Sequence, residues 1–148
     1  MRIIVFLLIS ILFVSCNSSE EKETTKSDEE FVFDIQEPSE MTNLMLSMYD
    51  FNENLKKEIL AGKTPEEFPK EFLKIYTAEL TGNKPYNDIF KAYSKVYIDN
   101  ERAIFDKSSK VPLIDRYNNA INTCISCHTT ECVGPIPRIE KLLIKKPL

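Results

Sequence analysis

Hydrophobic residues recur at steps of three and four along most of the chain after residue 38, which is the spacing of one face of an α-helix. The first such stretch predicts a helix over residues 39–61, with apolar positions at Met41, Leu44, Met45, Met48, Phe51, Leu55 and Ile59. Gly62 follows it and suits a helix C-terminus. No stretch of useful length alternates between apolar and polar residues, so the pattern indicates an all-α protein.

Three further helices follow from the same spacing. The second begins at the capping sequence over residues 64–67 or at Pro69 and ends at Leu80; the third spans residues 87–105. The fourth begins near Pro112 and closes at Gly134, and a short final turn over residues 138–144 is expected to pack back over the others. Inward-facing positions are expected at Phe68, Phe72, Ile75, Tyr76 and Leu80 in the second helix. The apolar positions of the third are Ile89, Phe90, Tyr93, Val96, Tyr97, Ile104 and Phe105. Short loops between four amphipathic helices favour an antiparallel four-helix bundle.

The N-terminus has a different pattern. Arg2 precedes an apolar run over residues 3–14. Such a run is too short to span a bilayer, which needs about 20 residues, and it is typical of a secretory signal. Cys16 follows Ser15, and this context resembles the lipobox of bacterial lipoproteins. The resemblance implies a signal peptide over residues 1–15 and a lipid on Cys16; an export signal with an incidental cysteine is the alternative.

Charge separates the chain into two parts. Residues 17–37 hold eight acidic and two basic residues, a net charge of −6, whereas residues 38–148 are close to neutral. The acidic stretch has few residues that could form a core, so residues 16–37 are predicted to be a flexible tether between a lipid anchor and a folded domain over residues 38–148. No basic patch with interleaved aromatic residues indicates a nucleic-acid partner.

A Cys-x-x-Cys-His motif lies on the predicted fourth helix. It consists of Cys124, Cys127 and His128, the only histidine in the chain. This is the attachment motif of c-type haem. Residues three apart share one face of a helix, so two thiols there reach the two vinyl groups of one porphyrin, and the histidine binds the iron from the same side. The motif therefore predicts one covalent haem c, with His128 as an iron ligand.

Two other kinds of site use the same residue types. A thiol-redox pair has the Cys-x-x-Cys spacing, but it usually follows a strand in a βαβ unit, which the pattern here lacks. A structural zinc site would use Cys124, Cys127, His128 and Cys132. Four such ligands suit zinc, although adjacent residues of a helix diverge by about 100° and do not easily converge on one small ion.

A Cys-x-x-Cys-His motif on the last helix of a four-helix bundle resembles the class II c-type cytochromes, cytochrome c prime and cytochrome c-556. The resemblance covers about residues 39–131. In that family the residue above the distal face of the haem lies on the first helix, which implies Met45 as the distal iron ligand and Met48 as the second candidate. The chain departs from the family after His128, where the segment over residues 129–135 ends the helix early. Cys132 is left without an assigned role, and we expect it to be a buried thiol near the haem edge.

These features predict electron transfer outside the cytoplasm. Methionine ligation opposite His128 would raise the reduction potential and block small ligands. Redox proteins of the cell envelope would be the partners, at the periplasmic or the cell-surface side of a membrane, and a homodimer is left open. A five-coordinate haem that binds nitric oxide or carbon monoxide is the alternative, and a structural zinc-binding lipoprotein domain is the second alternative. No acid–base pair is placed by a motif, so the chain is not expected to be an enzyme.

Overall fold

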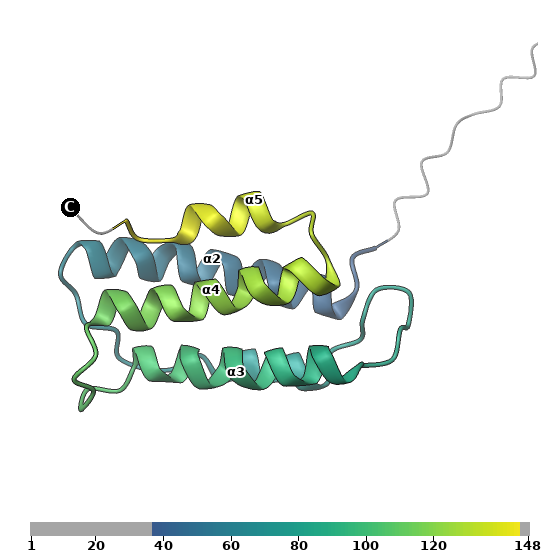
Figure 1. Cartoon of the computed structure of the whole chain (residues 1–148), viewed down its shortest axis with the longest axis horizontal. Helices are drawn as coiled ribbons and strands as arrows, with labels where there is room; N and C mark the ends of the chain where they lie inside the picture. Colours follow the sequence, from purple (N-terminus) through teal and green to yellow (C-terminus); the bar gives the residue numbers. More distant parts are fainter. Residues whose placement is uncertain (1–36, 146–148) are drawn as a thin grey trace, which may run out of the picture. The chain divides into compact units, whose positions relative to one another are not determined.

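The computed structural model describes residues 37–145, which contain helices joined by loops (Figure 1). The elements are α2 (Glu40–Leu60), the 3-10 helix η2 (Lys70–Tyr76), α3 (Asp88–Ile104), α4 (Leu113–Glu131), α5 (Ile136–Ile139) and the 3-10 helix η3 (Glu140–Leu142). No strand occurs within residues 37–145, so the all-α prediction is confirmed there. The predicted signal peptide, Cys16 and all but the last residue of the predicted tether lie outside the described residues.

The three long helices begin and end close to the predicted residues, and side chains cap the N-termini of α2 and α3. The Ser39 hydroxyl accepts a hydrogen bond from the Thr42 amide at 3.2 Å, and the Asn87 side chain accepts one from the Phe90 amide at 2.6 Å. Gly62 follows α2 with a φ of 76°, a left-handed conformation that glycine adopts without steric cost. Pro112 precedes α4, and α4 ends at Glu131.

The second predicted helix is wrong in type. Residues 70–76 form a 3-10 helix, not an α-helix. The buried positions here are Pro69, Phe72, Ile75 and Ala78, and they recur every three residues, which is the period of a 3-10 helix. Tyr76, expected to face inward, is 44% exposed as a result.

Not all of the apolar positions of α3 lie in the core. Ile89 and Val96 are about half exposed, whereas Phe90 and Tyr97 are buried. The buried face of α3 contains two polar residues, Ser94 and Glu101.

The helix α4 runs antiparallel to both α2 and α3 (Figure 1). At one end of the α3–α4 pair the Asn87 amide donates to the Glu131 carboxylate at 3.1 Å. At the other end the Arg116 guanidinium donates to the last carbonyls of α3, those of Ala103 at 2.7 Å and Ile104 at 3.0 Å. A cation at this position also suits the negative end of the helix dipole. The η2 segment packs on α2 and α3.

Two apolar clusters form the core, and Cys124 packs against both. The first joins the N-terminal half of α2 with η2 and α3, and its buried members are Met41, Leu44, Met48, Phe72, Ile75, Ala78, Phe90, Tyr97 and Ile98. The second joins the C-terminal half of α2 with the end of α3, with α4 and with the last turns. Its buried members are Leu55, Ile59, Ile104, Tyr117, Ala120, Ile121, Ile139, Leu142 and Ile144. We call these the first and the second cluster.

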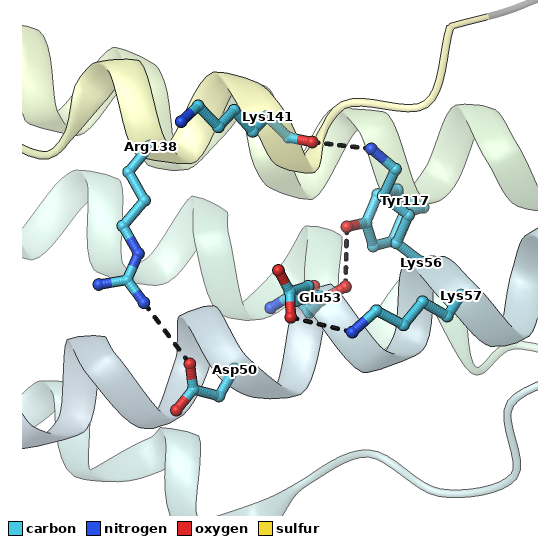
Figure 2. Close-up of polar contacts among 8 residues, drawn as sticks. Asp50, Glu53, Lys56, Lys57, Tyr117, Arg138 and Lys141 are labelled. Carbon is cyan, nitrogen blue, oxygen red and sulfur yellow. Dashed lines mark hydrogen bonds and ion pairs between the residues drawn. The ribbon is translucent and has the colours of Figure 1, made fainter.

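The final segment packs back over α2 and α4, as predicted. Figure 2 shows the Lys56 ammonium donating to the Lys141 carbonyl at 2.7 Å; it also donates to the Leu143 carbonyl at 3.0 Å. Arg138 lies 3.7 Å from the Asp50 carboxylate and 3.8 Å above the Tyr49 ring. Within the described part of the chain, no helix combines the length and the apolar character that crossing a membrane requires.

Candidate functional site

The three residues of the Cys-x-x-Cys-His motif lie on the last two turns of α4. The Cys124 side chain contacts both core clusters, and the side chains of Cys127 and His128 are half-buried. Residues at positions i, i+3 and i+4 share one face of a helix. Two sulfurs and one imidazole are therefore presented together at the boundary between the core and the surface.

The end of α4 fixes the orientation of the His128 ring. The imidazole Nδ1 lies 2.8 Å from the backbone oxygen of Cys132, which follows the helix with an extended backbone. A carbonyl oxygen only accepts hydrogen bonds, so Nδ1 carries the proton and donates it. The lone pair of the neutral ring is then on Nε2, which is the state of a histidine prepared to bind a metal.

The two thiols of the motif favour their neutral form. Burial raises the pKa of Cys127 to about 11, and the nearby Glu131 carboxylate acts in the same direction. Burial, followed by the charge of Glu101, raises the pKa of Cys124 still further. Reactive thiol pairs have the opposite property, a lowered pKa that stabilises the thiolate. With no strand within residues 37–145 to supply a βαβ context, the thiol-redox interpretation gains no support.

The geometry also gives no support to the zinc alternative. Among residues 37–145, no three histidine, cysteine or acidic side chains gather in an arrangement that could hold a metal ion. Cys132 is exposed, so the expectation of a buried thiol near the haem edge is wrong. The reason is local, because α4 ends at Glu131 and the residues from Thr129 to Gly134 all lie at the surface.

The methionines of α2 lie near the same part of the core. Met41 and Met48 are buried members of the first cluster, and Met45 is half-buried and packs against it. Cys124 packs against this cluster from α4. The fold therefore brings the predicted distal candidates and the first motif cysteine to one apolar region, although their residues are about 80 positions apart in the chain.

Sequence reasoning missed a buried carboxyl group beside the motif. Glu101, on α3, has no exposed surface, and both of its carboxyl oxygens lack a hydrogen-bond partner. A negative charge on Glu101 raises the pKa values of Cys124 and Tyr117, which are both on α4. The spacing of the apolar residues could have indicated that position 101 is buried. Phe90, Tyr97 and Ile104 follow one another at steps of seven, and a helix face that buries them also includes position 101.

The donor set of the motif fits covalent attachment of a haem. The donor set consists of two thiols on one helix face and an imidazole with Nε2 free, and the apolar first cluster lies on the inner side of that face. Two surface clefts lie elsewhere, one beside Phe51 and residues 67–71 and the other between residues 37–42 and 79–83.

Comparison with known proteins identified no relative. No protein-family model matches this chain, and no curated protein or solved structure matches it.

Proposed function

We propose that this chain is a c-type cytochrome that transfers electrons outside the cytoplasm. Cys124 and Cys127 hold one haem through thioether bonds, and the Nε2 atom of His128 is an iron ligand. The observation that carries the proposal is the hydrogen bond from His128 Nδ1 to the Cys132 carbonyl, on the helix face that also bears both thiols. It prepares the one histidine of the chain for metal binding at the position that the motif requires.

The haem, when bound, supplies reversible one-electron exchange at its iron. The residues of the chain bind and orient it and keep water away. The buried side chains of the first cluster provide an apolar environment, which influences the reduction potential. Met45 is the first candidate for the distal iron ligand and Met48 the second. Methionine sulfur at that position favours electron transfer over the binding of small ligands.

The resemblance to class II cytochromes extends this proposal to the arrangement of the helices. We propose a four-helix haem domain in which η2 takes the place of the second helix and α4 carries the haem. Lipid attached to Cys16 and an acidic tether would hold the domain at the cell envelope, where redox proteins are its partners. No catalytic role is assigned to it.

Production in a host that exports the chain and attaches haem to it tests the proposal. The purified protein is expected to be coloured, to keep its haem after denaturation and acid–acetone extraction, and to show the pyridine haemochrome spectrum of thioether-linked haem. A His128→Ala variant is expected to keep the covalent haem and to lose the native spectrum. A colourless protein from a host that matures another c-type cytochrome would overturn the proposal.

Nitric oxide or carbon monoxide binding is the second candidate function. It is favoured by the packing of Met41, Met45 and Met48, which all contact the first cluster whether or not one of them reaches the iron. A reduced spectrum that is unchanged by carbon monoxide supports a methionine ligand and electron transfer. A spectral shift on addition of carbon monoxide supports an open coordination position.

A further inference from the structure

The core of the domain contains a carboxyl group that has neither a hydrogen-bond partner nor a positively charged partner among residues 37–145. Glu101 is completely buried on α3, and neither Oε1 nor Oε2 has a hydrogen-bond partner. A charged carboxylate in such a position carries a large desolvation penalty unless it is paired. The usual outcome is that the group holds a proton and stays neutral.

The groups that face Glu101 come from three helices. Asn52 on α2 and Tyr97 on α3 lie near the carboxyl group and favour its charged form, but neither makes a hydrogen bond of good geometry with it. Tyr117 and Cys124 face it from α4. No arginine or lysine among residues 37–145 lowers the pKa of the Glu101 carboxyl group.

Glu101 is the member of this group that titrates near neutral pH. Burial raises its pKa to about 8. Burial also raises the pKa values of Tyr97 and Tyr117 above the ordinary tyrosine value, so both hydroxyls remain neutral. The thiol of Cys124 becomes a thioether in the proposed holoprotein and then has no proton to lose.

The packing of α3 on α4 places this carboxyl group beside the proposed haem attachment. The Asn100 side chain donates to the Thr123 hydroxyl at 2.9 Å, which holds this part of α3 against α4, and the Glu101 carboxylate raises the pKa of the Cys124 thiol across the same helix contact. A thioether at Cys124 joins the edge of the porphyrin directly to this position. Oxidation of the iron adds one positive charge to the haem, and in the interior of a protein such a charge favours the ionised form of a neighbouring carboxyl group.

We propose that Glu101 holds a proton in the reduced protein and releases it in the oxidised protein, so that electron transfer is coupled to proton transfer at this carboxyl group. This inference rests on the proposed function. On oxidation one electron passes from the haem iron to a one-electron acceptor, the O–H bond of the Glu101 carboxyl group breaks, and the proton goes to solvent. Reduction reverses each step, so charge and atoms balance.

The test is the reduction potential of the holoprotein as a function of pH. A difference in proton affinity on the order of tenfold between the two redox states is the size expected for one charge acting across the protein interior. The potential is then expected to fall by about 59 mV in total as the pH rises from 6 to 10, since tenfold corresponds to about 59 mV for a one-electron couple. Redox difference infrared spectra between pH 7 and 8 are expected to show a stronger protonated carboxyl band in the reduced protein than in the oxidised protein.

A Glu101→Gln variant removes the titrating proton and keeps the shape of the side chain. It is expected to have a potential that is constant over this pH range and no carboxyl band. The control is Asp99→Asn, which changes an exposed carboxylate on α3 that pairs with Lys95 at 2.6 Å. This variant is expected to keep both the pH dependence and the band.

The possible results separate this inference from the proposed function. A haem protein whose potential is constant from pH 6 to 10 overturns the coupling and leaves the cytochrome intact. A pH dependence that persists in Glu101→Gln overturns the assignment to Glu101. If that variant does not fold, the infrared band of the unmodified protein decides, because its absence overturns the coupling. A protein without haem overturns both.

Discussion

The Tyr117 hydroxyl on α4 donates a hydrogen bond of 2.9 Å to the backbone oxygen of Asn52 on α2, inside the core (Figure 2). This bond joins the N-terminal part of α4 to the middle of α2, and Tyr117 belongs to the second cluster. Because Tyr117 has no exposed surface, water does not replace the bond when it is removed.

Tyr117→Phe is therefore expected to lower the free energy of unfolding by about 1 kcal/mol, the usual contribution of a buried hydrogen bond. Denaturation in urea measures this change. Tyr49→Phe is the matched control, because Tyr49 contributes the face of its ring to Arg138 and that face is unchanged in phenylalanine. Equal effects of the two substitutions would contradict the role of the Tyr117 hydroxyl.

The three cysteines of the described region are expected to behave differently on substitution. In the proposed haem protein, Cys124→Ser and Cys127→Ser are each expected to remove one thioether bond, whereas Cys132→Ser is expected to leave the haem content unchanged because that thiol is exposed. The Cys132 backbone carbonyl that orients His128 remains in this variant. Intact mass and haem staining after denaturing electrophoresis measure the outcome. Loss of haem in Cys132→Ser would contradict it.

Substitution of Met45 is expected to change the spectrum of the haem, whereas substitution of Met48 is expected to change the stability of the fold. Met45→Ala is expected to change the iron from low spin to high spin and to open it to carbon monoxide. Met48 is buried, so Met48→Ala is expected to cost about 2–5 kcal/mol of stability and to keep the spectrum. Absorption spectra with and without carbon monoxide, together with urea denaturation, measure both properties. A spectrum that changes only in Met48→Ala would move the ligand to that residue.

The buried carboxyl group predicts how stability depends on pH. The pKa of Glu101 is about 8 in the folded protein, against 4.5 for an ordinary glutamate. Its contribution is therefore complete below pH 4.5 and is lost as the pH rises towards 8, because over this range the unfolded chain ionises while the folded one stays protonated. The loss is on the order of 1 kcal/mol per pH unit.

Urea denaturation at pH 5, 6.5 and 8 measures this dependence. Glu101→Gln is expected to flatten it and to raise the stability at pH 8, whereas Asp99→Asn is expected to retain it. A steeper loss of stability in Glu101→Gln than in the unmodified protein would mean that the carboxylate is charged and paired.

Lys56 is expected to hold the final segment in place. Its ammonium donates to two backbone oxygens of that segment, and Lys56→Met is expected to cost about 1–2 kcal/mol and to speed amide hydrogen exchange over residues 136–145. Lys57→Met is the control, since Lys57 forms only an exposed ion pair with Glu53, at 3.0 Å, worth less than about 1 kcal/mol. Unchanged exchange in Lys56→Met would show that apolar packing alone holds the segment.

The sequence predicts the three long helices well because periodicity and caps agree there. Ser39, Asn87 and Gly62 stand at the ends that the apolar spacing implies, and each makes the expected hydrogen bond or backbone turn. The segment over residues 70–76 was missed because Phe68, Phe72 and Ile75 also suit an α-helix. The three-residue period becomes visible only when Pro69 and Ala78 are known to be buried.

The candidate site was only partly predictable for a similar reason. Local spacing identifies Cys124, Cys127 and His128, since all three lie within two turns of one helix. The position of the Cys132 carbonyl beside His128 depends on where α4 ends. The environment of Glu101 depends on how α3 packs on α4. The apolar pattern of a single helix does not predict such contacts between elements.

The final segment has a consequence for the order of events in the cell. Ile139, Leu142 and Ile144 complete the second cluster around Tyr117, and they follow the cysteines in the chain. In the proposed export of the chain, with its N-terminal side leading, the part of the second cluster that these residues supply would still be missing while the cysteines leave the channel. The thiols would then be open to solvent on an incompletely folded domain, and the interior would close only after the last turns have followed.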